Sequence, residues 1–376
     1  MILLLSPAYP LRGGIASSSE RLAQAFQQQG KEVEICSFRL QYPHFLFPGK
    51  TQYATDDPAP DLTIHTWVNS INPFNWLWVG WKLRQKKPDL IIVRFWIPFM
   101  GPCLGAILRL AKSNGHTRII AITDNVIPHE KRPGDRLFTR WFIGAVDAFV
   151  VMSRSVEGDI RQFTPTKPVR YIPHPIYDNY GEKISRELAL KQLGLASDKS
   201  YLLFFGFIRD YKGLDLLLEA MRDDRLRKMP IHLLVAGEFY TDPAPYHQMV
   251  AQAELGDRVS FYGDYIPNEQ VKYYFGAADL VVQPYKSATQ SGISQMAYHF
   301  GKPMVVTRVG GLPEIVEHGK AGYVVAVEPA AIADAIADFF ENQRQKDMES
   351  AVHLASQQFS WENMVEGLEA LKKGEI

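Results

Sequence analysis

The pattern that runs through this chain is clearest in the stretch Tyr201-Leu202-Leu203-Phe204-Phe205-Gly206-Phe207-Ile208-Arg209-Asp210-Tyr211-Lys212-Gly213-Leu214. Its first five residues are apolar and predict a buried strand, and the residues from Leu214 onward predict a helix. Arg209 and Lys212 therefore lie on a glycine-bounded loop between a strand and a helix. In open α/β sheets such loops bind ligands, because helix N-termini point their free N–H groups there. Two cations at this position suit a phosphate group, although two solvated surface cations would give the same pattern.

The same alternation of short apolar runs and amphipathic helices extends over the whole chain. It predicts strands at 2–5, 32–37, 90–94, 118–123, 148–152, 201–205, 231–236, 259–262, 280–283 and 304–307. It predicts helices at 16–29, 104–113, 214–222, 270–275, 295–300, 330–342 and 361–373. Strands that alternate with helices are typical of βαβ units and parallel sheets. We therefore expect an α/β protein with two Rossmann-like, doubly wound domains.

The boundary between the two halves is predicted at residues 171–180, where prolines and polar residues gather as in a domain linker. This gives an N-terminal domain at 1–175 and a C-terminal domain at 176–360, followed by a last helix at 361–376. Two domains joined by a hinge would enclose a cleft, which is the usual place for a small-molecule site.

The overall composition excludes several function classes. The chain has 376 residues, and its 41 Lys and Arg balance its 41 Asp and Glu, so no global charge suggests a nucleic acid partner. Its two cysteines, Cys36 and Cys103, lie in apolar surroundings, and no Cys/His cluster has metal-ligand spacing.

The apolar start, Met1 to Leu5, reads as a first strand rather than a signal peptide. No apolar run reaches the ~18 residues of a membrane span. We expect a cytoplasmic protein, either free or bound at the inner face of a membrane.

Two further loops of the first half carry candidate site residues. Gly13 and Gly14 separate the first strand from the first helix, where they would let a ligand approach the backbone; a plain tight turn, or less readily a dinucleotide site, would use the same residues. The segment Thr123–Glu130 follows another strand. Its Asp124 and His129 could orient a hydroxyl or act in acid–base catalysis, although a hydrogen-bonded turn would also explain the segment.

Two loops of the second half repeat the arrangement at 206–213. Residues 285–293 place small hydroxyl side chains and Gly292 directly before a helix, as in an anion-binding nest. Residues 309–314, Val-Gly-Gly-Leu-Pro-Glu, follow the next strand. Three strand-to-helix loops with anion- or sugar-binding chemistry in one domain are much less expected by chance than any single one.

The order and spacing of these motifs resemble the GT-B glycosyltransferases, specifically the large retaining family 4. The motifs that carry the resemblance are Gly13-Gly14, Asp124 to Glu130, Gly206 to Gly213, Ala277 to Pro284, Gly301-Lys302-Pro303, Gly310 to Glu314 and Phe359-Ser360-Trp361. The resemblance implies a GT-B fold and a nucleotide-diphosphate sugar as donor.

The resemblance also implies roles for individual residues. Arg209 and Lys212 would hold the diphosphate and, with Asp124, form the catalytic set. The remaining donor contacts would come from Gly13, Gly14, Gly206, Gly263, Tyr265, Ile266, Thr289, Gln290, Ser291, Gly292 and Met296. Asn125, His129 and Glu130 would contact the acceptor or the transferred sugar. The last helix would pack back on the first domain.

The chain departs from the family pattern at one important place. The family usually carries a pair of glutamates in the region of residues 287–297, and this chain has no acidic residue there. Ala288 or Thr289 stands at the first position and Met296 at the second, while Asp124 replaces a common histidine. Gln290, Ser291 and Gly292 could still hold the diphosphate or the sugar by hydrogen bonds.

Aromatic residues lie beside a basic cluster in the segment 67–87. Trp67, Phe74, Trp76, Trp78 and Trp81 precede four cations, Lys82, Arg84, Lys86 and Lys87. This combination suits the headgroup region of an anionic membrane, although the aromatics could instead form the buried side of a helix. Membrane contact would fit a lipid-linked acceptor.

From these observations we expect a metal-independent, retaining glycosyltransferase without a cofactor. It would move a sugar from a nucleotide sugar to a glycan or lipid-linked acceptor in cell-surface polysaccharide or glycolipid synthesis. No Asp-x-Asp sequence is present, so the protein's own cations would neutralise the leaving diphosphate. A nucleotide-sugar epimerase of the same architecture, or a relative that binds nucleotide sugars without catalysis, would share these features.

Overall fold

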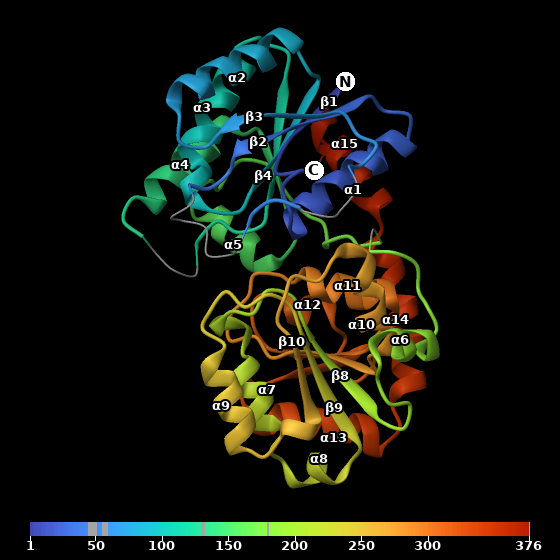
Figure 1. Cartoon of the computed structure of the whole chain (residues 1–376). Helices are drawn as coiled ribbons and strands as arrows, with labels where there is room; N and C mark the ends of the chain where they lie inside the picture. Colours follow the sequence, from blue (N-terminus) through green and yellow to red (C-terminus); the bar gives the residue numbers. More distant parts are fainter. Residues whose placement is uncertain (44–50, 55–58, 129–131, 179, 376) are drawn as a thin grey trace. The chain divides into compact units, whose positions relative to one another are not determined.

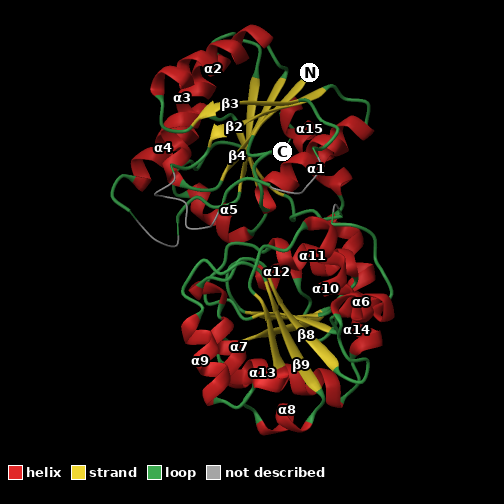
Figure 2. Cartoon of the chain, in the orientation of Figure 1, coloured by secondary structure: helices red, strands yellow, loops and turns green. Residues whose placement is uncertain are grey.

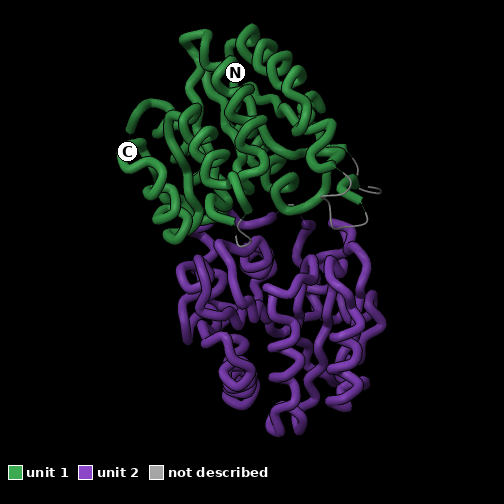
Figure 3. The backbone as a smooth tube through the Cα atoms, turned by 90° about the vertical axis from the view of Figure 1, so that its left-hand side faces the viewer, with its two compact units in different colours: residues 1–174, 360–376 green, residues 175–359 purple. Residues whose placement is uncertain are grey.

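The chain forms two compact units in the computed structural model, which describes residues 1–43, 51–54, 59–128, 132–178 and 180–375. One unit contains residues 1–174 together with 360–376, and the other contains residues 175–359 (Figure 3). The chain thus passes from the first unit to the second after His174 and returns after Phe359.

The first unit is built on a seven-stranded parallel sheet with the order β3-β2-β1-β4-β5-β6-β7. Its strands are β1 (Ile2–Leu5), β2 (Val33–Leu40), β3 (Ile64–Asn69), β4 (Leu90–Phe95), β5 (Arg118–Thr123), β6 (Ala148–Val151) and β7 (Val169–Tyr171). The central strands are buried on both faces and accordingly read as continuous apolar runs.

Helices cover both faces of this sheet (Figures 1 and 2). One face carries α2 (Pro73–Lys86), α3 (Gly101–Lys112), α4 (Asp135–Ala145) and α5 (Arg154–Arg161). The other carries α1 (Gly14–Gln28) and the last helix, α15 (Trp361–Lys373). Trp361 and Leu368 of α15 share one apolar cluster with Leu22 and Phe26 of α1, so the last helix completes the core of the first unit.

The second unit repeats this plan on a six-stranded parallel sheet with the order β10-β9-β8-β11-β12-β13. Its strands are β8 (Ser200–Phe205), β9 (Ile231–Ala236), β10 (Val259–Tyr262), β11 (Leu280–Gln283), β12 (Met304–Thr307) and β13 (Gly322–Val325). One face carries α6 (Arg186–Leu193), α10 (Val271–Ala277), α11 (Gly292–Phe300), α12 (Leu312–Ile315) and α14 (Gln345–Ser356). The other carries α7 (Leu214–Ala220), α8 (Asp224–Lys228), α9 (Ala244–Gln252) and α13 (Pro329–Glu341). The predicted fold class is confirmed.

Both cysteines are buried free thiols in the first unit's core, where burial raises the pKa of Cys36 to about 12. None of the helices in the described ranges is both long and apolar enough to span a lipid bilayer.

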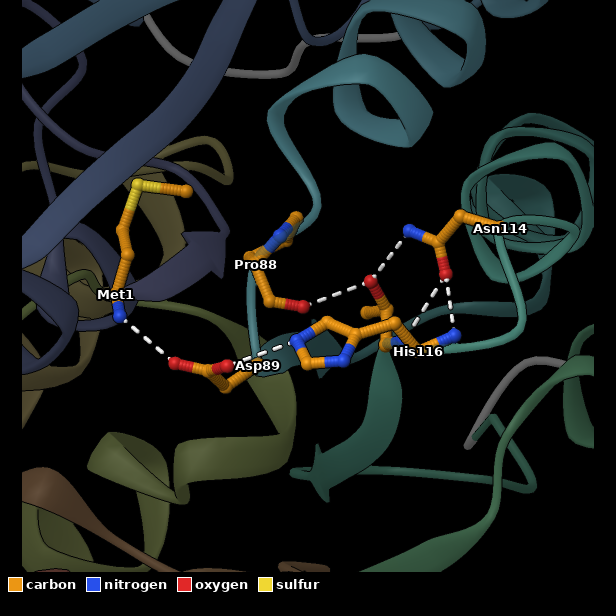
Figure 4. A network of polar contacts seen from close by, with 6 residues as sticks. Met1, Pro88, Asp89, Asn114 and His116 are labelled. Carbon is orange, nitrogen blue, oxygen red and sulfur yellow. Dashed lines mark hydrogen bonds and ion pairs between the residues drawn. The ribbon is translucent and has the colours of Figure 1, made fainter.

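A polar network ties together the amino ends of three strands in the first unit (Figure 4). The Met1 ammonium nitrogen lies 2.8 Å from Asp89 Oδ2 and His116 Nε2 lies 2.8 Å from Asp89 Oδ1. Hydrogen bonds from these two groups lower the pKa of Asp89 to about 2. Thr117 Oγ1 donates to the carbonyl oxygen of Pro88 over 2.7 Å. The amino-terminal ends of β1, β4 and β5 are therefore joined to one another. The loops that follow these strands lie at the opposite, carboxyl-terminal ends.

Candidate functional site

The second sheet has a switch point beside β8, where the strand order changes direction. β9 and β10 lie on one side of β8, and β11, β12 and β13 lie on the other. Ligands of open α/β sheets bind at the carboxyl ends of the strands next to such a point. The loop after β8 carries Arg209 and Lys212, and the loop after β11 carries Thr289, Gln290 and Ser291. Sequence-predicted donor residues of two separate motifs therefore meet at the expected edge of the sheet.

The loop after β8 is held from both sides by its neighbours. The Ile208 N–H donates to the carbonyl oxygen of Glu238 in the loop after β9 over 2.8 Å. On the other side, the Lys286 N–H in the loop after β11 donates to the carbonyl oxygen of Tyr211 over 2.7 Å. These backbone bonds fix the position of the loop between its two neighbours.

Lys212 is a buried cation, only 8% exposed, at the end of this loop. A Cβ atom on Gly206 would lie 3.2 Å from Lys212 Nζ and 3.1 Å from Ile293 Cδ1, so the ammonium group lies between the end of β8 and the first turn of α11. The ring centroid of Tyr285 is 5.6 Å from Nζ. Within the described residues, the ammonium group has no hydrogen-bond acceptor and no carboxylate partner.

Burial has a direct effect on the charge of this lysine. Removal from water, followed by repulsion from Arg209, lowers the pKa of Lys212 to about 7. A charged ammonium without a partner is costly in such a place, and an anion beside it would remove the cost. The geometry and the pKa therefore both indicate a position for a negatively charged ligand.

Arg209 is half-buried and is positioned by an aromatic ring. Its Cζ lies 4.9 Å from the ring centroid of Tyr240, which in turn packs against Phe207 with centroids 4.5 Å apart. Arginine stacks well on aromatic faces and keeps its planar fork for anions. Sequence reasoning missed Tyr240, because nothing in the pattern links a residue after β9 to a cation after β8.

The first turn of α11 lies beside this candidate anion position. Ser291 begins the helix and its hydroxyl oxygen accepts from the Ile293 N–H over 3.2 Å, while the first turn contains no acidic residue. The helix dipole therefore adds partial positive charge near Lys212. Gly292 packs closely against Tyr177, since a Cβ there would lie 2.5 Å from Tyr177 Cε2.

The loops after β11 and β12 are joined by the glycine pair at 310–311. The Gly311 N–H donates to the carbonyl oxygen of Thr289 over 3.0 Å. Gly310 has φ 50, and a Cβ there would lie 1.7 Å from the carbonyl oxygen of Ala288. Only glycine allows the two backbones to lie this close together, so the loop after β12 holds residues 288–291 in place.

Met296 does not fit its predicted role as a donor contact. It is 3% exposed and packs in the apolar core cluster below α11, because its place on the helix points it inward. The preceding residue, Gln295, is fully buried, and both its amide oxygen and its amide nitrogen lack hydrogen-bond partners within the described residues. Polar atoms in such a place are rare and Gln295 is thus a candidate that sequence reasoning missed.

The predicted base-binding loop follows the edge strand β10. A Cβ on Gly263 would lie 3.2 Å from the Phe239 ring, while Tyr265 is half-buried and Ile266 packs against the core. β10 is two strands from β8, so the two loops are about 10 Å apart at strand spacing. Gly263 and Ile266 therefore belong to the same edge of the sheet as Lys212.

The first unit holds the remaining described candidates. Gly13 lies directly before Gly14, the first residue of α1. The φ of Gly13 is 108, a conformation that glycine adopts readily. Asn125 Oδ1 is buried without a hydrogen-bond partner among the described residues. His129 and Glu130 lie outside the described residues.

Asp124 forms a buried, bidentate ion pair with Arg94 of β4. Arg94 Nε donates to Oδ2 over 3.1 Å and a terminal nitrogen donates to Oδ1 over 2.7 Å. Both side chains are nearly excluded from water. Both oxygens of Asp124 are thus engaged by one guanidinium group, which fixes the carboxylate in place. This arrangement suits a positioning role for Asp124 better than proton transfer.

Within the ranges that the structure describes, His, Cys, Asp and Glu side chains nowhere form a group of three or more that could hold a metal ion.

Two family models match this chain, one on each unit. The model described as Glycosyltransferase Family 4 matches residues 12–179, and the model described as Glycosyl transferases group 1 matches residues 185–357. Together they cover every strand of the two sheets except β1, and all the loops of the candidate site. The chain belongs to the GT-B glycosyltransferases of family 4.

Curated relatives support this membership. The D-inositol 3-phosphate glycosyltransferase of Streptomyces coelicolor is 29% identical over 263 residues, which cover 67% of this chain and 56% of the relative. The lipopolysaccharide 1,2-N-acetylglucosaminetransferase of Salmonella typhimurium is 27% identical over 237 residues, covering 60% of this chain and 61% of the relative. The chain thus spans between about half and three fifths of the length of the curated relatives it matches.

Solved structures share the fold over nearly the whole chain. Sucrose-phosphate synthase from Thermosynechococcus elongatus superposes with a TM-score of 0.77 at 18% identity, covering 99% of this chain and 98% of that one. HepE from Anabaena, in complex with UDP and glucose, gives a TM-score of 0.73 at 16% identity, covering 98% and 100%. At this identity the likeness establishes the fold.

Proposed function

We propose that the protein is a retaining, metal-independent glycosyltransferase. It would transfer a sugar from a nucleotide-diphosphate sugar to a glycan or lipid-linked acceptor in cell-surface polysaccharide or glycolipid synthesis. A lipid-linked acceptor would place the reaction at the inner face of a membrane. Family membership supports the transfer chemistry, and a solved neighbour bound to UDP and glucose supports this class of donor.

One observation carries the proposal: the unpartnered, buried ammonium of Lys212 beside the first turn of α11. Both groups supply positive charge at the switch point between β8 and β11. A diphosphate in this position would lie about 10 Å from the loop after β10, two strands away. Gly263 and Tyr265 would then contact the nucleoside, which extends from its diphosphate in that direction.

The arrangement suits stabilisation of the leaving group. When the bond between the sugar and the diphosphate breaks, the electron pair stays on the diphosphate oxygen. The acceptor hydroxyl oxygen bonds to the sugar, and its proton passes to the leaving diphosphate. Lys212, Arg209 and the α11 N-terminus would stabilise the charge that develops on the diphosphate. Fixed cations of the protein would perform here what a divalent metal performs in other enzymes.

Asp124 and Arg94 would serve the reaction indirectly. Their ion pair fixes the loop that begins at residue 124 and so positions Asn125, whose buried Oδ1 lacks a partner among the described residues. In this proposal Asn125 contacts the transferred sugar or the acceptor. Gly13 and Gly14 would provide backbone contacts from the first unit.

The test is an incubation of the full chain with a panel of nucleotide sugars, with and without added glycan and lipid-linked acceptors. Release of nucleoside diphosphate that depends on an acceptor would support transfer, and the anomeric configuration of the product would test retention. EDTA should leave the rate unchanged. Conversion of the sugar without release would instead identify an epimerase and contradict the proposal.

The missing glutamate pair favours a second candidate function. Residues 287–297 contain no acidic side chain, and Met296 at the second glutamate position is buried in the core. A protein with this departure could bind nucleotide sugars without transferring them. Saturable donor binding together with no turnover on any acceptor would favour this alternative.

A further inference from the structure

Helix α2 of the first unit is apolar on two opposite faces. With about 3.6 residues per turn, Trp76, Val79, Gly80 and Leu83 fall on one face of the helix. Val79 and Leu83 are in the core, and Trp76 packs on it while its indole N–H donates to the carbonyl oxygen of Asn69 over 2.8 Å. This face attaches the helix to the sheet and to α3.

The opposite face consists of four large apolar side chains that the protein leaves in solvent. Phe74 is 84% exposed, Leu77 57%, Trp78 43% and Trp81 51%. They recur at the spacing of a single helical stripe. Ile71, in the turn before the helix, is 50% exposed and extends the apolar surface beyond the N-terminus of α2. We call these five residues the α2 stripe. An exposed apolar patch of this size marks an interaction site.

Cations flank the α2 stripe on both sides. At about 100° per residue, Lys82 and Arg84 project on opposite flanks of the stripe. The Lys82 ammonium lies 4.3 Å from the ring centroid of Trp67 and 4.4 Å from that of Trp78, so the aromatic rings hold the charge at the stripe's border. Neither Lys82 nor Arg84 forms an ion pair among the described residues. The segment from Ile64 to Lys87 contains no acidic residue at all.

We propose that the α2 stripe inserts into the surface of an anionic lipid bilayer. Tryptophan side chains partition to the headgroup level of membranes, and lysine and arginine beside them attract anionic lipids. A helix with one face in the protein core and the other in the headgroup layer would lie parallel to the bilayer plane. The proposal rests on α2 alone and is independent of the donor site, although it fits an acceptor carried by a lipid.

The charges argue against a second copy of the chain as the occupant. In a two-fold symmetric dimer the same surface contributes from both copies. Lys82 and Arg84 would then approach their own equivalents, with no acidic residue of the segment to compensate them. An anionic surface has no such repulsion.

The experiment is co-sedimentation of the full chain with vesicles of phosphatidylcholine, with and without phosphatidylglycerol. We expect binding to the anionic vesicles that weakens at high salt, because surface charges are screened. The double variant Trp78→Ser/Trp81→Ser should bind at least about tenfold more weakly, from the apolar area lost. Lys82→Gln/Arg84→Gln should weaken binding only to the anionic vesicles.

The matched control is Leu188→Ser/Leu354→Ser, which removes two exposed apolar side chains of 50% and 68% exposure from the second unit. It should bind as the unmodified chain does. Phe74→Ser changes the most exposed residue of the stripe and guards against a folding defect in the double variant. Unchanged vesicle binding by both stripe variants, or no binding to either vesicle, would overturn the proposal. So would a dimer that dissociates in the double variant. Melting shifts with nucleoside diphosphates should be the same in all variants, so a failed donor site would be seen separately.

Discussion

Among the described residues, each unit has one buried lysine or arginine near the carboxyl ends of its strands, and the two differ in whether the protein pairs them. Arg94 in the first unit meets both oxygens of Asp124. Lys212 in the second unit meets no acceptor among the described residues. Burial alone is similar, since Arg94 is 3% and Lys212 8% exposed. The difference lies in whether the protein supplies the counter-charge itself.

Arg94 is thus a cation that the protein pairs itself, and Lys212 is a cation for which we propose a ligand as the partner. A paired buried ion stabilises one local arrangement and resists change, because either partner alone would be left uncompensated. An unpaired buried ion lowers the stability of the fold, and a bound anion would remove that cost. Lys212 is therefore expected to matter for binding and rate, and Arg94 for stability.

The largest expected effect is on stability, from Asp124→Ala. Removing this carboxylate leaves the Arg94 guanidinium buried without a partner, which should cost about 3–5 kcal/mol in the free energy of unfolding. Urea denaturation measures this directly. The double variant Arg94→Met/Asp124→Leu should recover most of the loss. A single variant as stable as the unmodified chain would show that the pair is not the structural element we infer.

The next effect is on rate, from Lys212→Ala. The change should lower kcat by about 10²–10³-fold, because charge stabilisation at the leaving diphosphate is lost. Stability should not fall, in contrast to Asp124→Ala, since no partner is left behind. Lys320→Ala, at an exposed position, is the matched control and should turn over normally. Near-normal kcat in Lys212→Ala at saturating donor would contradict the proposed mechanism.

A smaller effect is expected on the pH dependence of nucleotide binding. The free protein holds Lys212 at a pKa of about 7, and a bound diphosphate would raise that pKa. Below pH 7 the lysine is charged in both states. Above pH 7 binding must take up a proton, so the dissociation constant should rise by up to about tenfold per pH unit. Calorimetric titration of UDP and other nucleoside diphosphates between pH 7 and 9 checks this, and Lys212→Ala should remove the dependence.

The smallest effect concerns the aromatic support of Arg209. Tyr240→Leu removes the ring 4.9 Å from the guanidinium carbon and should cost about 0.5–1 kcal/mol, a change of a few fold in donor KM. Arg209→Ala should cost more than this, and Arg209→Lys should recover only part, because lysine lacks the planar fork. Equal KM values in Tyr240→Leu and the unmodified chain would show that the ring does not position Arg209.

Much of the fold was predictable, and the omissions have a physical pattern. The strands that sequence reasoning missed, β3, β7 and β13, all lie at sheet edges. An edge strand is paired on one side only and has fewer neighbours to bury it, so its sequence need not be a continuous apolar run. The central strands of both sheets, which are buried on both faces, were predicted nearly to the residue.

The positions of the candidate site residues were predictable where these residues share a loop and not where they meet across strands. Arg209 and Lys212 follow a strand directly, so their position could be inferred from order alone. The pairing of Arg94 with Asp124 depends on the register of β4 with β5, which local pattern does not reveal. Met296 and Gln295 are neighbours on α11 and differ only in the direction in which the helix points their side chains. Met296 packs in the apolar core, whereas the amide of Gln295 is buried without a hydrogen-bond partner among the described residues. Helix α2 was ambiguous because it is apolar on both faces.

The return of α15 to the first unit has a consequence for how the chain is made. Trp361, Val365 and Leu368 fill one face of a sheet whose strands lie among the first 171 residues. The ribosome synthesises those strands long before it reaches α15. Until α15 is made, part of the apolar face of the first sheet therefore stays uncovered. Residues 175–359 are contiguous and can close their own cores during synthesis. The second unit is therefore able to complete its folding before the first, in the reverse of their order along the chain.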